Sequence, residues 1–73
     1  MIYSLNDFRV EGGFLRIDIE SHNYALRVSA ISTITIRYYP KENNWELTLR
    51  VDGHRYYFTF AENPSALMGM LTQ

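Results

Sequence analysis

The stretch Val51-Asp52-Gly53-His54 constrains the fold more than any other part of the chain. An Asp-Gly pair between two runs of alternating residues is the strongest short-range signal for a two-residue type I′ hairpin, which fixes the register of both strands. Pairing outward from the turn predicts one buried apolar face made of Trp45, Leu47, Leu49, Val51, Tyr56, Phe58 and Phe60. The opposite face is polar, and it brings Arg50 directly across from Arg55.

A second turn signal lies near the start of the chain, where Gly12-Gly13 separates two further runs of alternating residues. A polar cluster follows, in which a two-residue loop is expected at Ser21-His22. The predicted pairs are Val10 with Leu15 and Phe8 with Ile17 around the first turn, and Ile19 with Tyr24, Ile17 with Leu26 and Leu15 with Val28 around the second. These turns predict a three-stranded meander with strands near 6–11, 14–20 and 23–29.

The segment 24–39 leaves two arrangements open. Apolar residues keep one parity from Tyr24 to Tyr38, and only Ser32 breaks the row. Either one long bent strand runs through this segment, or a short turn separates two strands. Turn-forming residues fill 40–44, so strands near 33–39, 45–51 and 54–60 are expected to form a second meander.

The last part of the chain carries a helix start signal, with Asn63 as N-cap and Pro64 at the first helical position. A helix is expected over 65–71. Its apolar positions are Ala66, Leu67, Met70 and Leu71. Gly69 weakens this helix and favours a close approach to the sheet, and a helix this short must be docked to be stable.

These elements predict an α+β, mostly β domain that spans residues 1–73. Two antiparallel three-stranded meanders are expected to form a bent sheet or partial barrel, with one C-terminal helix packed on it. By its layout alone the chain resembles a shortened pleckstrin-homology superfold, which implies a strongly bent sheet whose open end the helix closes. A likeness of layout implies no activity.

Size and charge narrow the class of protein. The chain has 73 residues, no cysteine, and seven basic against eight acidic side chains. A domain of this size buries only about 60% of the surface that its unfolded chain exposes, so a partner subunit is expected to add stability that no disulfide supplies. Balanced charge makes any anion site a local one. No stretch approaches the roughly 20 apolar residues of a membrane span, and a cytoplasmic protein without a membrane partner is expected.

The polar face of the second meander carries the candidate ligand-binding residues, which are Arg37, Arg50, Arg55, Tyr39 and Tyr57. Like charges directly opposite in a sheet are destabilising, which is a reason to expect an anion between Arg50 and Arg55. A pair of guanidinium groups flanked by tyrosines suits a phosphate, a nucleotide or a stacked base. The alternative is an ordinary surface on which Glu46, Asp52 and solvent screen the arginines.

The first meander also carries arginines on its outer face. Arg9, Arg16 and Arg27 are expected to line up across its three strands among acidic residues and to form a solvated salt lattice. On the same face Asp7 is expected to face Asp18. A flat surface flanked by arginines is a poor setting for a carboxylate pair in acid–base catalysis, so no catalytic residue is predicted there.

The motifs of enzymes and cofactor sites are missing from the sequence. His22 and His54 fall at turns without a second ligand at metal-binding spacing, so no metal site is predicted. No serine has the context of a nucleophile elbow, and no phosphate-binding or dinucleotide glycine pattern occurs, so neither catalysis nor a cofactor is expected. Tyr38 and Tyr39 are adjacent in a strand, so one of them must project outward, and the sequence leaves open which.

These features favour binding over catalysis. The first hypothesis is a small standalone protein that acts through protein–protein interaction, of the accessory or inhibitor type that bacteria and their phages use, and that associates with itself. The alternative is a binder of an anionic small ligand or a nucleic acid on the Arg37, Arg50 and Arg55 face. Salt separates the two, because phosphate contacts weaken steeply as salt rises and an apolar protein interface hardly responds.

Overall fold

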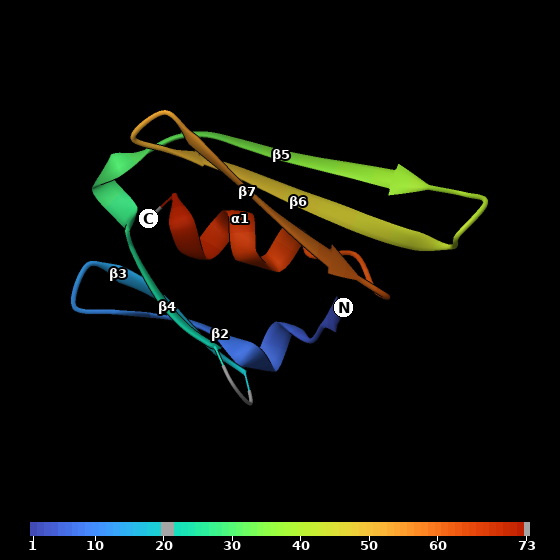
Figure 1. Ribbon diagram of the computed structural model, residues 1–73, viewed down its shortest axis with the longest axis horizontal. Helices are drawn as coiled ribbons and strands as arrows, with labels where there is room; N and C mark the ends of the chain where they lie inside the picture. The colour runs from blue at the N-terminus through green and yellow to red at the C-terminus, as the bar shows by residue number, and fades with distance from the viewer. Residues whose placement is uncertain (20–21, 73) are drawn as a thin grey trace.

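The computed structural model describes residues 1–19 and 22–72 and shows two sheets with one α-helix between them (Figure 1). Within these residues, sheet A has four strands in the order β1-β7-β6-β5 and sheet B has three in the order β2-β3-β4. The elements are β1 (Ile2–Tyr3), β2 (Phe8–Glu11), β3 (Phe14–Ile19), β4 (His22–Arg27), β5 (Ile31–Tyr39), β6 (Asn44–Val51), β7 (His54–Phe60) and α1 (Ser65–Leu71). The prediction of a mostly β domain with a C-terminal helix is confirmed.

The hairpin of β6 and β7 has the predicted register. Leu49 pairs with Tyr56 and Arg50 pairs with Arg55. The turn residues Asp52 and Gly53 have φ angles of 50° and 84°, and a type I′ turn requires φ above zero at both central positions. The apolar face is buried as expected at Leu47, Leu49, Val51, Phe58 and Phe60, while Trp45 and Tyr56 are half-buried.

The segment 24–39 forms two strands rather than one. β4 ends at Arg27, a 3-10 helix, η2 (Val28–Ala30), turns the chain, and β5 begins at Ile31. Because the chain coils here instead of continuing as a corner strand, the two halves form separate sheets. The prediction of a single bent sheet or partial barrel is therefore wrong in this respect: the strands form two sheets and do not close into a barrel.

Sheet B confirms one predicted register and corrects the other. β2 and β3 pair as expected around Gly12-Gly13. β4 is shifted by two residues against β3, because Ile19 pairs with His22 and not with Tyr24. His22 is a strand residue and not part of a loop, and the other residue of the predicted loop, Ser21, lies outside the described residues. An even shift keeps every side chain on its predicted face.

The N-terminal segment forms structure that the sequence patterns did not predict. β1 adds to β7 in parallel, with Ile2 opposite Thr59, and makes sheet A mixed. A 3-10 helix, η1 (Leu5–Asp7), follows, and its capping box joins Ser4 and Asp7: the Asp7 carboxylate accepts from the Ser4 amide at 3.0 Å. Asp7 therefore belongs to η1 and not to the β2–β3 ladder, which begins at Phe8. The expected pairing of Asp7 with Asp18 is wrong.

One core joins both sheets and the helix. Its buried hydrophobic residues are Phe8, Leu15, Ile17 and Leu26 from sheet B, Leu47, Leu49, Val51, Phe58 and Phe60 from sheet A, and Leu67 and Leu71 from α1. The ring of Tyr3 lies edge-on to Phe8 at 5.8 Å and to Phe58 at 5.2 Å. The N-terminal strand thus contacts the cores of both sheets.

The helix forms over the predicted residues with a different cap. Pro64 occupies the N-cap position, and the Asn63 side chain accepts from the Ser65 amide at 3.0 Å. Ala66, which was expected on the apolar side of the helix, is exposed. The expected close approach at Gly69 is also wrong, because a Cβ there would meet nothing within 4 Å. Among the described residues, no helix is long and apolar enough to cross a membrane.

Candidate anion-binding face

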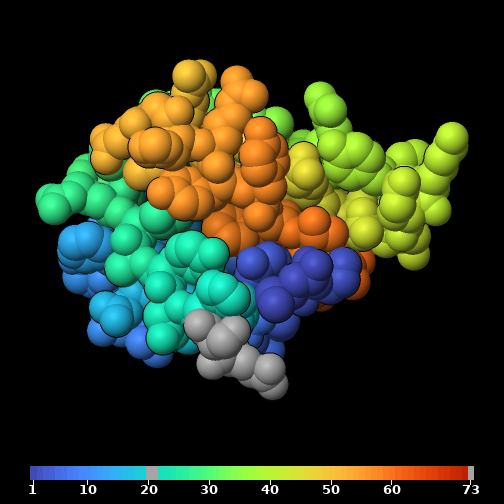
Figure 2. All heavy atoms as spheres, in the orientation of Figure 1, coloured from blue at the N-terminus to red at the C-terminus, as the bar shows by residue number. Residues whose placement is uncertain are grey.

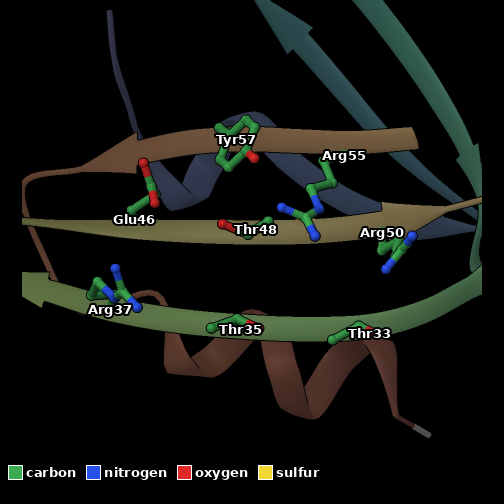
Figure 3. Close-up of a pocket in the computed structure, with 8 residues that line it drawn as sticks. All are labelled: Thr33, Thr35, Arg37, Glu46, Thr48, Arg50, Arg55 and Tyr57. Carbon is green, nitrogen blue, oxygen red and sulfur yellow. The ribbon is translucent and has the colours of Figure 1, made fainter. Parts of the chain in front are cut away.

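Sheet A packs one face on the core and leaves the other, polar face open. Eight residues of the polar face line a concavity of about 370 Å³ (Figure 3): Thr33, Thr35, Arg37, Glu46, Thr48, Arg50, Arg55 and Tyr57. These eight residues are called the arginine face below. Four of the five residues that the sequence singled out for ligand binding lie together in it, namely Arg37, Arg50, Arg55 and Tyr57.

The ladder arranges the arginine face in rows across the strands. The first row is Thr33, Arg50 and Arg55, the second is Thr35, Thr48 and Tyr57, and the third has Arg37 beside Glu46. Arg37 is four positions from Thr33 along β5, which is about 13 Å in an extended strand. Two of the three positive charges are therefore concentrated at one end of the concavity.

The arginines of this face lack acidic partners. Within the described part of the chain, no carboxylate oxygen lies within 4.0 Å of the guanidinium nitrogens of Arg37, Arg50 or Arg55. Glu46 pairs with Arg37 in the ladder, but its carboxylate accepts from the Tyr39 hydroxyl at 3.2 Å and points toward β7 in Figure 3. Three positive side chains against one negative one leave the concavity with an excess of two positive charges.

Arg50 and Arg55 form the most closely spaced part of the site. The closing pair of a two-residue hairpin is hydrogen-bonded, so the next pair, Arg50 and Arg55, is a non-hydrogen-bonded one, whose Cα atoms approach to about 4.5 Å. In Figure 3 the Arg55 guanidinium extends from β7 over β6, between Thr48 and Arg50. Two forked donors side by side match the geometry of an oxyanion.

The remaining residues of the arginine face supply neutral contacts. Thr33, Thr35 and Thr48 offer hydroxyl groups that donate or accept hydrogen bonds. Tyr57 is 55% exposed and stands in the middle row, where an aromatic or sugar ring can lie against it. Tyr57 is among the residues predicted for ligand binding, and Thr33 and Thr35 are not, although the alternation that places Arg37 on this face places them there as well.

Tyr39 lies on the predicted face but does not line the concavity. It is half-buried, and its hydroxyl is engaged by Glu46. The more exposed of the two adjacent tyrosines is Tyr38, at 42%, on the opposite face, with its ring 4.7 Å from that of Trp45. The end of the β5–β6 hairpin projects from the body of the molecule, so even its inward-facing side chains reach solvent (Figure 2).

The other residues considered from the sequence take structural positions. The predicted salt lattice is present in part: Arg9 pairs with Glu11 and Asp18, each at 3.4 Å, and no ion pair of Arg16 or Arg27 occurs within the described residues. Arg27 does not line up with Arg16, because the shifted register pairs it with Phe14, and its guanidinium lies 5.4 Å from the centre of that ring. The described residues contain no group of three or more His, Cys, Asp or Glu side chains that could hold a metal ion.

Comparison with known proteins adds no relative. No family model, no curated protein and no solved structure matches the chain.

Proposed function

We propose that this chain is a small binding protein and that its arginine face takes an anionic ligand that bears a phosphate group. One observation carries the proposal: the guanidinium groups of Arg37, Arg50 and Arg55 line one concavity, and no described carboxylate lies within 4.0 Å of them. A bound oxyanion would supply the negative charge that the protein does not.

The size and lining of the concavity indicate the class of ligand. A volume of about 370 Å³ falls at the lower end of the range for small-molecule sites, which is roughly 300–1,000 Å³. Arginine forks and threonine hydroxyls are suited to phosphate oxygens, and Tyr57 supplies a surface for a ring attached to them. A mononucleotide or a phosphorylated metabolite fits this description.

Thermal unfolding in the presence of ligands tests the proposal. Pyrophosphate and ADP, added at constant ionic strength, are expected to raise the melting temperature, because a ligand at 100 times its Kd stabilises the folded state by about 2.7 kcal/mol. The double variant Arg50→Gln with Arg55→Gln is expected to lose this shift. The matched control, Arg16→Gln with Arg27→Gln, removes the same charge from sheet B and should keep it. Equal loss in both double variants would contradict a site on the arginine face.

A second candidate function is binding of another protein, as an accessory or inhibitor protein does, with self-association as one form of it. The observation that favours it is the outer edge of β5, nine residues long, which no described strand covers. Native mass spectrometry separates the candidates. A small molecule retained on a monomer supports the first function, and a mass that includes a second chain supports the second.

A further inference from the structure

The free edge of β5 exposes unpaired backbone groups at known positions. Ser32 Oγ donates to the Arg50 carbonyl oxygen at 3.3 Å, so the Arg50 carbonyl is directed toward β5. Arg50 and Thr33 are thus a hydrogen-bonded pair of the ladder, and alternation makes every second residue from Thr33 bond to β6. The N–H and C=O groups of Ile34, Ile36 and Tyr38 therefore point away from β6, toward the open side.

A groove runs beside this edge, between β5 and α1. It has a volume of about 370 Å³, and its apolar lining includes Ile31 and Ile34 from β5 and Met68 and Leu71 from α1. In Figure 3, where sheet A is seen from its polar side, α1 is visible beyond the β5 edge. The edge of the strand and the side of the helix thus border the groove.

We infer that an extended segment of a partner protein adds to β5 as a further strand of sheet A and places apolar side chains at alternate positions against α1. The inference rests on the protein-binding function proposed above and names its surface. The backbone groups of Ile34, Ile36 and Tyr38 supply the hydrogen bonds of the added strand. The groove reaches along β5 as far as Ile34 and receives the apolar side chains at that end of the added strand. The other side chains of the added strand lie beside Thr33, Thr35 and Arg37 and face solvent.

A lone strand fits this edge better than a second copy of the chain. In a symmetric antiparallel pairing of two β5 strands, both copies would direct the same face of sheet A to the same side. In each copy, α1 lies on the apolar side of sheet A and extends beyond the edge of β5. The helices of the two copies would therefore occupy the same space beneath the paired β5 strands. An extended peptide has no such helix, and the occupant is accordingly a strand from a different protein.

Selection from a peptide library supplies the probe. A displayed library of random nine-residue peptides is selected on the immobilised wild-type protein, and the enriched sequences are synthesised and measured by fluorescence anisotropy. We expect enrichment of apolar residues at alternate positions. N-methylation of the peptide backbone is expected to weaken binding by about tenfold or more at every second residue and to have little effect in between, because only alternate amides face β5. Absence of enrichment, or of this alternation, overturns the inference.

Protein variants locate the site. Met68 is half-buried, lies outside the core cluster and lines the groove. Met68→Lys is therefore expected to weaken the binding of the enriched peptides by about tenfold and to leave the fold intact. Ala66→Lys places the same charge on an exposed position of α1 outside the groove and is the matched control. Circular dichroism checks that both variants fold.

The outcomes separate this inference from the functions on which it depends. If the peptides bind wild type and Met68→Lys equally, they bind elsewhere on the protein. The inference about the groove is then wrong, while the protein-binding function survives. A dimer that forms in sedimentation and is lost in Met68→Lys, with no peptide enriched, would make a second copy the occupant and overturn the inference. The double variant Arg50→Gln with Arg55→Gln should bind the peptides as wild type does, so failure of the anion site leaves this result unchanged.

Discussion

Two pairs of arginines face each other across strands in this protein, and their surroundings differ. On sheet B, Arg9 pairs with Arg16, and the Arg9 guanidinium has the carboxylates of Glu11 and Asp18 at 3.4 Å. On sheet A, Arg50 pairs with Arg55, and no described carboxylate lies within 4.0 Å of either. The same local arrangement therefore gives a neutralised surface in one sheet and a candidate anion site in the other.

The difference arises from what alternates with the arginines along each strand. β2 carries Arg9 and Glu11 on its outer face and β3 carries Arg16 and Asp18, so each arginine has an acidic residue on its diagonal. The outward positions beside Arg50 and Arg55 are Thr48 and Tyr57, which carry no charge. Two unit charges 4 Å apart in water interact by about 1 kcal/mol, which is too little to disrupt a sheet and enough to favour a bound anion. A like-charge pair indicates a binding site only where its neighbours leave it uncompensated.

The largest expected effect tests whether the two sheets behave as one body. Leu47 in sheet A and Leu15 in sheet B are both fully buried in the shared core. Leu47→Ala and Leu15→Ala are each expected to cost about 2–5 kcal/mol, a large part of the stability of a domain this small. Urea unfolding followed by Trp45 fluorescence and by circular dichroism should give one coincident transition in each variant. A Leu15→Ala protein that loses sheet B while the Trp45 signal persists would show two independent units.

The next effect concerns the turns that set each arginine pair in register. Gly53 and Gly13 have φ angles of 84° and 82°, and a Cβ at either would meet nothing within 4 Å. Gly53→Ala and Gly13→Ala are therefore expected to cost only the backbone penalty of the left-handed region, about 1–2 kcal/mol each. Gly69→Ala in α1 is the control of opposite sign, since alanine favours a helix by about 1 kcal/mol over glycine. Chemical denaturation measures all three, and a stabilising Gly53→Ala would contradict the type I′ turn.

Short-range signals predicted the parts of the fold that they determine by themselves. Asp52-Gly53 and Gly12-Gly13 specify both their conformation and their register, so the Arg50–Arg55 pair and most of the arginine face follow from the sequence. The turn after Ile19 has no such dipeptide, and one residue of error in the loop shifted the register by two. Because the shift was even, the faces were right and the neighbours of Arg27 were wrong.

The parts that could not be predicted depend on tertiary contacts. β1 has two residues and no pattern, and it forms because Tyr3 packs between Phe8 and Phe58. The open space around Gly69 and the groove beside β5 reflect where α1 docks, which no local signal encodes. The concave shape of the arginine face likewise comes from the arrangement of three strands, although its residue types could be listed from alternation alone.

A smaller effect tests the compensation on sheet B. Asp18→Asn removes the carboxylate nearest to the Arg9 Nη2 atom and leaves Arg9 and Arg16 with less negative charge around them. The expected loss of stability is about 0.2–1 kcal/mol, because the Arg9 side chain is 58% exposed and the pair is screened by solvent. Thermal unfolding at low salt measures it, with Glu62→Gln, at an exposed position outside the strands, as the control that removes the same charge. No difference between the two variants would show that the salt lattice contributes nothing.

The smallest effect has the opposite sign and distinguishes a binding surface from a structural one. Arg50→Gln relieves the repulsion across β6 and β7, so in phosphate-free buffer at low salt its stability should equal that of wild type or exceed it by a few tenths of a kcal/mol. At 1 M salt the screening length falls to about 3 Å, and the difference should vanish. A double-mutant cycle with Arg55→Gln should give an unfavourable coupling between the two arginines. If Arg50→Gln instead lowers stability and salt does not alter the loss, the arginine stems pack over the strands, and the unpaired charges of sheet A are a by-product of that packing.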